Sequence, residues 1–154
     1  MICLYANYMK KFFNMKYFLI LTLSLFSFTA YAADVTVEML NKLGNETMVY
    51  SEKVVRIDVG NKVIWKATDK GHNVEFIKGG VPEGVEKFKS KFNKDTQYTF
   101  EIPGIYAYWC TPHKNMGMIG FVVVGNDKSN LEAIKNLRFS ARSKKIAPGL
   151  IDSL

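Results

Sequence analysis

The amino-acid sequence predicts an all-β protein, a Greek-key sandwich of about eight strands that ends in a short α-helical tail. Two patterns favour this fold class. Between residues 34 and 124, apolar and polar residues alternate in short runs that glycine, proline and asparagine separate. After Gly125, apolar residues recur at helical spacing instead. Many short strands punctuated by turns are typical of a β-sandwich.

The alternation predicts eight strands. They are residues 34–40, 47–50, 54–59, 62–65, 72–77, 96–102, 105–109 and 120–124. Residues 41–46 are rich in turn formers, and Gly60-Asn61 predicts a tight hairpin between the third and fourth strands. Residues 78–93 are irregular, which predicts a surface loop with a helical turn near 86–88.

The tail has the signals of two short helices. Ser129 and Glu132 match a capping box, so a helix is expected from Ser129 to Phe139. A second helix is expected between Ser140 and Leu154, interrupted at Pro148-Gly149.

Residues 1–32 have the three parts of a secretory signal peptide. The start is positively charged, residues 17–28 are apolar, and residues 30–32 (Ala-Tyr-Ala) form a cleavage signature. The apolar run is shorter than the about 20 residues that a membrane span needs. We therefore expect an exported protein whose residues 33–154 form a single domain without a membrane anchor. Three methionines are candidate starts: Met1, Met9 and Met15.

The net charge and the number of cysteines limit the kinds of partner and the roles of Cys110 that are plausible. The chain has a net charge of +7, and loss of the three lysines in residues 1–32 leaves +4. This moderate charge suits docking to an acidic protein, whereas no basic run with interleaved aromatics indicates nucleic acid. Cys3 leaves with the signal, so Cys110 has no partner for an intramolecular disulfide. A lone thiol in an oxidising compartment is a liability unless it is buried, reactive or bound to a metal.

Residues 106–120 place soft ligand atoms in one short loop. Cys110 and His113 are two residues apart, and Met116 and Met118 follow. His72, the other histidine, lies in a separate predicted strand. One thiolate, two imidazoles and a thioether are a ligand set for copper. From the residues alone, either methionine can be the fourth ligand.

Two other chemistries use some of the same residues. Zinc accepts a thiolate and two imidazoles, but a hydrolytic zinc site needs a nearby general base and no acid adjoins the loop. A nucleophilic Cys110–His113 pair lacks a third residue to orient the histidine. Taken singly, each of these cysteine, histidine and methionine residues could also be an ordinary core or surface residue without a ligand role. Their combination favours copper.

Two motifs contain the candidate ligands: Gly71-His72-Asn73-Val74 and the run from Cys110 to Met118. Both motifs resemble those of the type 1 (blue) copper proteins of the cupredoxin family, in particular the pseudoazurins. The resemblance implies a cupredoxin-like fold for residues 33–154. It also implies that one copper ion is bound by His72, Cys110, His113 and Met118. The amicyanin pattern would use Met116 instead.

The same resemblance implies a periplasmic electron carrier rather than an enzyme, with copper cycling between Cu(I) and Cu(II). In that family the electron leaves through the histidine that matches His113, and Asn73 supports the thiolate. An apolar rim of Pro112, Met48 and Met116 is expected around His113. A ring of lysines is expected to steer an acidic partner, and they are Lys42, Lys70, Lys78, Lys87, Lys89, Lys91 and Lys114.

The implied partner is a denitrification reductase such as copper nitrite reductase, docked transiently to a monomer. Two alternatives stay open: an amicyanin-like carrier for another dehydrogenase, and a periplasmic copper-binding or delivery protein. A reductase in its own right would need a second copper site and a second domain, for which 122 residues after cleavage leave no room.

Overall fold

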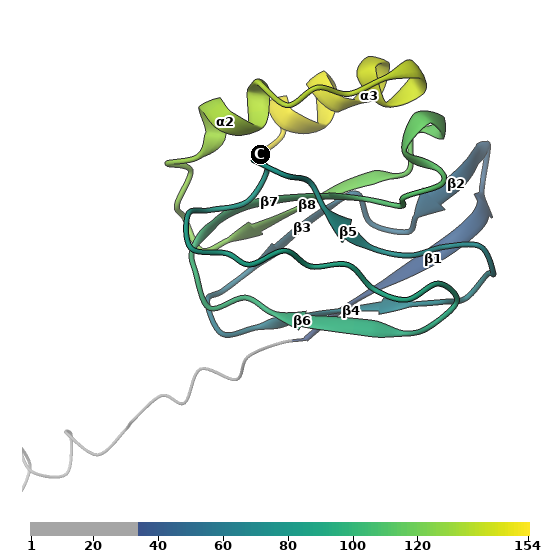
Figure 1. Ribbon diagram of the computed structural model, residues 1–154, viewed down its shortest axis with the longest axis horizontal. Coiled ribbons are helices and arrows are strands. Elements are labelled where there is room, and N and C mark those ends of the chain that lie inside the picture. Colours follow the sequence, from purple (N-terminus) through teal and green to yellow (C-terminus); the bar gives the residue numbers. More distant parts are fainter. Residues whose placement is uncertain (1–33) are drawn as a thin grey trace, which may run out of the picture. The chain divides into compact units, whose positions relative to one another are not determined.

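A computed structural model describes residues 34–154 (Figure 1). The expected signal peptide, residues 1–32, lies outside the described residues. The first sheet is built from β1 (Val35–Leu43), β2 (Glu46–Tyr50), β4 (Lys62–Lys66) and β6 (Thr96–Thr99). The second is built from β3 (Val54–Ile57), β5 (Glu75–Phe76), β7 (Gly104–Trp109) and β8 (Ile119–Val124). Three helices complete this part of the chain: the 3-10 helix η1 (Lys114–Met116), α2 (Leu131–Lys135) and α3 (Ala141–Asp152). No helix in residues 34–154 is long and apolar enough to cross a membrane.

The two four-stranded sheets confirm the predicted sandwich. Their strand orders are β2-β1-β4-β6 and β3-β8-β7-β5. β1 pairs with β4, and β3 with β8, in parallel, whereas the other pairs are antiparallel. Parallel neighbours arise because the chain crosses from one sheet to the other between them. Figure 1 shows the sheets face to face, with α2 and α3 over the second sheet.

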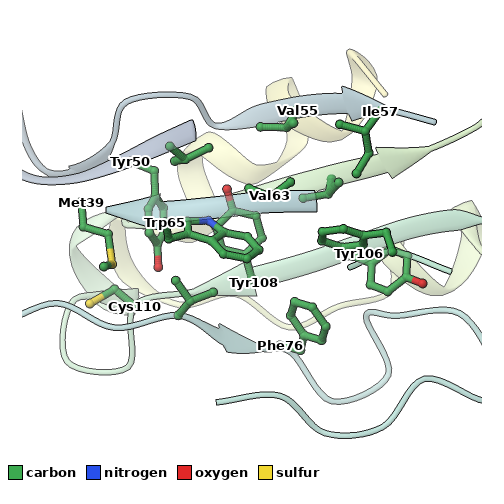
Figure 2. Packing of buried hydrophobic residues seen from close by; sticks show 14 of the residues in the cluster. Met39, Tyr50, Val55, Ile57, Val63, Trp65, Phe76, Tyr106, Tyr108 and Cys110 are labelled. Atoms are coloured by element: carbon green, nitrogen blue, oxygen red, sulfur yellow. The ribbon is translucent and has the colours of Figure 1, made fainter. Parts of the chain in front are cut away.

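The main core lies between the sheets (Figure 2). The first sheet contributes Met39 and Trp65, and the second contributes Tyr106 and Tyr108, all at most 1% exposed. The outer face of the second sheet is also covered, because α2 and α3 pack a second apolar cluster onto it. A sheet buried on both faces favours unbroken apolar strands. This is why all six residues of β8 are buried.

The predicted hairpin at Gly60-Asn61 is wrong. β3 pairs with β8, whereas β4 pairs with β1 and β6, so the two strands on either side of the turn belong to different sheets. The backbone of the turn bonds instead to Phe100, the residue that directly follows β6. Gly60 N–H donates to the Phe100 carbonyl at 2.9 Å, and Phe100 N–H donates to the Asn61 carbonyl at 3.0 Å. The turn is therefore a corner between the sheets.

Other boundaries also differ from the prediction. β1 continues through residues 41–43, which were expected to form a break, and turns only at Gly44-Asn45. No helical turn forms near 86–88, because this stretch runs alongside β5, where Phe76 N–H donates to the Phe88 carbonyl at 2.9 Å.

The tail is helical as predicted, but its details differ. α2 has no side-chain capping bond at its start. The side chain of Asn130 instead bonds both the N–H and the C=O of Ile105, at 3.0 and 2.7 Å, which ties the tail to β7. α3 runs without a break through Pro148-Gly149. Ala147 and Ile151 are buried on either side of this dipeptide, and their packing holds the helix together across the proline.

Gly120 offers a direct test of the packing between β7 and β8. A Cβ at position 120 would lie 2.4 Å from Cζ of the buried Tyr108. We expect Gly120→Ala to lower the free energy of unfolding by about 1–3 kcal/mol because a close-packed aromatic ring must shift. Gly149→Ala is the control, since nothing lies within 4 Å of its added Cβ. It should be neutral or stabilise by about 0.5–1 kcal/mol through a less flexible unfolded chain. Urea unfolding of both variants measures the difference, and equal midpoints would contradict the packing argument.

Candidate metal centre

The site is built from two loops at one end of the sandwich. His72 lies in the loop before β5 rather than in a strand as predicted, since only Glu75 and Phe76 pair there. Cys110 directly follows β7, and His113 precedes η1. The second loop closes on itself: Cys110 N–H donates to the Met118 carbonyl at 3.0 Å, and His113 N–H donates to the Cys110 carbonyl at 3.1 Å. Gly117 ends η1 at a φ of 99°, a conformation that favours glycine.

The structure brings three of the predicted ligands together. Nδ1 of His72 and Nδ1 of His113 are 3.2 Å apart. Sγ of Cys110 is 3.5 Å from Nδ1 of His113 and 3.8 Å from Nδ1 of His72. Metal bonds of about 2.0 Å to nitrogen and about 2.3 Å to sulfur would separate donors around one ion by about 3.3–3.8 Å. The donor atoms therefore fit a single metal ion.

A hydrogen bond at the ring nitrogen that faces away from Cys110 and His113 fixes the orientation of His72. Its side chain is fully buried, and its Nε2 lies 3.0 Å from Oδ1 of Asn41. If Nε2–H donates this bond, Nδ1 keeps its lone pair for a metal, which is the usual role of a hydrogen-bond partner behind a histidine ligand. Burial and the neighbouring His113 lower the pKa of His72, and burial lowers that of His113, so both favour the neutral form. Asn41 was not predicted as a neighbour of the site, because residues 41–43 were expected to form a break rather than the end of β1.

Cys110 is also fully buried. Burial raises the pKa of its thiol, and the backbone N–H groups of Asn73 and His113 act in the opposite direction. A bound cation favours the thiolate strongly. The effect of the Asn73 backbone on the pKa of Cys110 is consistent with a place for Asn73 beside the sulfur, which stays a prediction from the resemblance.

The two methionines of the loop differ in burial. Met118 is 0% exposed and belongs to the same core cluster as Cys110. Met116 is 43% exposed. Met116 also lines a shallow surface hollow together with Met48 and Arg142. The burial favours Met118 as the inner ligand and Met116 as a surface residue.

A polar network joins the two loops beside the sulfur. Thr111 N–H donates to Oδ1 of Asn73 at 2.8 Å, and Nδ2 of Asn73 donates to Oγ1 of Thr111 at 2.9 Å. The Thr111 hydroxyl in turn donates to Glu75 at 2.6 Å. Burial raises the pKa of Glu75, but hydrogen bonds from Thr111, Lys89 and Trp109 outweigh it, so the net shift is downward. This network was not predicted, since its members are far apart in sequence.

Trp109 points away from the metal site, as expected for a strand neighbour of Cys110. It packs against the outer cluster under the tail, whereas Cys110 belongs to the inner core. Its ring lies under the Lys114 ammonium, 4.8 Å from the ring centroid, and its Nε1–H is 3.3 Å from Glu75.

Known proteins share this sequence and fold. Residues 37–125 match the family of copper binding proteins of the plastocyanin/azurin type. A putative pseudoazurin of Rhizobium leguminosarum bv. viciae is 48% identical over 104 residues, which are 68% of this chain and 68% of that protein. The pseudoazurin of Paracoccus pantotrophus is 44% identical over 115 residues, 75% of this chain and 79% of that protein. The crystal structure of native pseudoazurin from Hyphomicrobium denitrificans has a TM-score of 0.75 at 36% identity, and the match covers 79% of this chain and 98% of that one.

The sandwich and its buried thiol–imidazole cluster, together with these matches, define a copper-binding cupredoxin. Membership of this class argues against the two alternatives, a hydrolytic zinc site and a nucleophilic Cys110–His113 pair. Within that class the chain belongs to the pseudoazurins. It is a copper electron-transfer protein and not an enzyme.

Thr111→Val tests whether the network holds the two loops together. The change keeps the side-chain volume but removes the hydroxyl, which leaves Nδ2 of Asn73 and the half-buried Glu75 short of a partner. We expect the metal-free protein to lose about 1–3 kcal/mol of unfolding free energy. Thr36→Val, at an exposed position of β1, should change it by less than about 0.5 kcal/mol. Denaturant unfolding without copper measures both. A Thr111→Val protein as stable as the control would show that the network is dispensable.

Proposed function

We propose that residues 1–32 direct export and are removed, and that residues 33–154 act in the periplasm as a single-domain, monomeric one-electron carrier. In this proposal His72, Cys110, His113 and Met118 bind one copper ion. The observation that carries it is the convergence of three donor atoms within 3.8 Å of one another at a buried site. The fully buried Met118 beside them supports it as the fourth ligand.

A bound copper ion supplies the Cu(I)/Cu(II) couple, taking up one electron from a donor and passing it to an acceptor. The protein would hold the ligand atoms in place for both oxidation states of the copper. Asn41 orients His72, and the Asn73–Thr111 pair locks the two loops to each other. Ligand atoms that the fold holds in place limit the rearrangement that accompanies each electron transfer.

Burial supports His113 as the exit for the electron. His72, Cys110 and Met118 are all 0% exposed, whereas His113 is half-buried. Next to it, Pro112 and Met116 are exposed. A partner that docks there would meet an apolar rim around the accessible ligand. A small apolar contact of this kind suits a brief encounter.

For the partner we propose an acidic redox protein such as copper nitrite reductase. The lysines expected to steer it are exposed at positions 42, 70, 78, 87, 89 and 91, and half-buried at 114. An amicyanin-like carrier for another dehydrogenase would use the same copper site, so only a partner assay separates the two. A delivery protein is less well supported, because three of the four proposed ligands are sealed from solvent.

Copper loading tests the ligand set. The Cu(II) protein should show an intense thiolate-to-copper absorption in the visible range, and Cys110→Ser should abolish it. Met118→Leu should shift the reduction potential by roughly 60 mV or more, which is a tenfold change in the relative affinity for Cu(I) and Cu(II). Met116→Leu is the matched control and should leave both spectrum and potential nearly unchanged. A colourless Cu(II) protein would refute the site, and a larger effect at Met116 would reverse the axial assignment.

A further inference from the structure

The start of the helical tail carries a concentrated positive charge. Residues 138–145 read Arg-Phe-Ser-Ala-Arg-Ser-Lys-Lys and contain no acid. All four cations of this run are exposed: Arg138, Arg142, Lys144 and Lys145. We name these four residues the tail patch.

The segment that carries the tail patch contacts the loop with His113 and Met118 through Ser140, Arg142 and Ser143. The Ser143 hydroxyl donates to the Lys114 carbonyl, and the Ser140 hydroxyl bonds Oδ1 of Asn115. A Cβ at Gly117 would lie 3.3 Å from Cδ of Arg142. Figure 1 shows the first turns of α3 above this loop, between β7 and β8. Arg142 thus reaches the edge of the surface where Met116 is exposed.

The two sides of the copper end differ in how far acids offset their cations. On the side of β5, Lys89 pairs with Glu75 at 3.3 Å, and Glu83 and Glu86 lie near Lys87 in the sequence. At the tail, Asp152 lines the same surface hollow as Arg138 and Lys144. Within residues 34–154, the only ion pair of a tail-patch cation is that of Arg142 with Glu46, at 4.0 Å, and Glu46 also accepts a bond from Lys53 at 2.5 Å. The tail patch therefore keeps most of its positive charge.

We propose that the tail patch is the docking surface for the acidic face of a redox partner protein. The partner then lies over His113 and is displaced toward α3 rather than centred within the lysine ring. This inference rests on the proposed electron-carrier function and names the surface that serves it. Exposed charges of this kind mainly speed association, and salt screens them.

The structure favours a protein partner over a lipid surface. Ala147 and Ile151, apolar residues of α3, are buried against the second sheet. A basic helix that binds a bilayer needs a free apolar face to insert among the lipids. This face of α3 is already packed against the second sheet, and the exposed side carries Arg142, Lys144 and Lys145.

A pair of double variants tests the docking surface. Arg142→Gln/Lys145→Gln removes two charges from the tail patch, and glutamine keeps the stem carbons that pack near Gly117. The control, Arg56→Gln/Lys62→Gln, also removes one arginine and one lysine. Arg56 pairs with Val123, four residues along β8 from the copper end, and Lys62 begins β4. Both variants have the same net charge. Because Arg56 donates to the Ser153 carbonyl at the end of α3 and Lys62 pairs with Asp34, urea unfolding first checks that both variants are folded, and a remaining difference in rate reports position.

The readout is the second-order rate of electron transfer from the Cu(I) protein to copper nitrite reductase, measured across ionic strength. At low salt, the tail variant should react about five- to tenfold more slowly than wild type, and the control less than about twofold. The difference should disappear at high salt. Equal rates for the two variants would overturn the proposal.

A probe that needs no reductase keeps the proposal separate from the proposed function. A synthetic glutamate-rich peptide is added to the ¹⁵N-labelled Cu(I) protein, and amide shifts are followed by NMR. Shifts should gather at residues 114–117 and 138–146 and weaken in the tail variant. Shifts centred on residues 78–91 instead would overturn the proposal even if nitrite reductase proved to be no partner. So would patch-dependent binding to anionic lipid vesicles without an effect of the peptide.

Discussion

The structure depends on bringing one sulfur and two nitrogen donor atoms together at a largely buried site, where only His113 reaches the surface. Two imidazoles and a thiol within 3.8 Å of one another have little to gain from burial unless an ion joins them. The fold meets this constraint with two loops locked to each other. The side chain of Asn73 and the hydroxyl and N–H of Thr111 form that lock. The loop with His72 runs from β4 of the first sheet into β5 of the second, and the loop with Cys110 joins β7 to β8 of the second sheet. The second sheet is buried on both faces and is therefore a rigid support.

The same constraint explains why the site faces outward at one point only. An electron carrier needs its metal shielded from solvent, yet close enough to the surface for a partner to reach it. Here His72 is sealed behind Asn41, and Met118 is in the core beside Cys110. His113 alone among the proposed ligands reaches the surface. In the proposed function, this difference in burial separates the ligands enclosed by the protein from His113, the one that a partner would reach.

The sequence was informative where the decisive contacts are local. Cys110, His113 and Met118 are close in the chain, so their spacing alone predicted a shared loop. The alternation of apolar residues likewise predicted most strands. The errors fall where distant segments decide. Gly60-Asn61 looks like a hairpin locally, but pairing of β3 with β8 sends its two strands to different sheets. Asn41 and Glu75 were missed as neighbours of the site because only the folded chain brings them there. Thr111 lies in the motif itself, but its role was missed because its partners are 36 and 38 residues away.

The tail shows how one segment can serve packing and recognition together. Ala147 and Ile151 close the outer cluster, and this packing carries α3 across Pro148 and Gly149. Because those residues fix the helix against the second sheet, the charged residues of its other face are held beside the metal loop. Fixed charges lose little side-chain and backbone freedom when a partner binds, so they can steer an encounter without making it long-lived. A carrier that must bind, react and leave needs this balance, and under the proposed docking a short basic helix packed against the loop of the half-buried His113 would provide it.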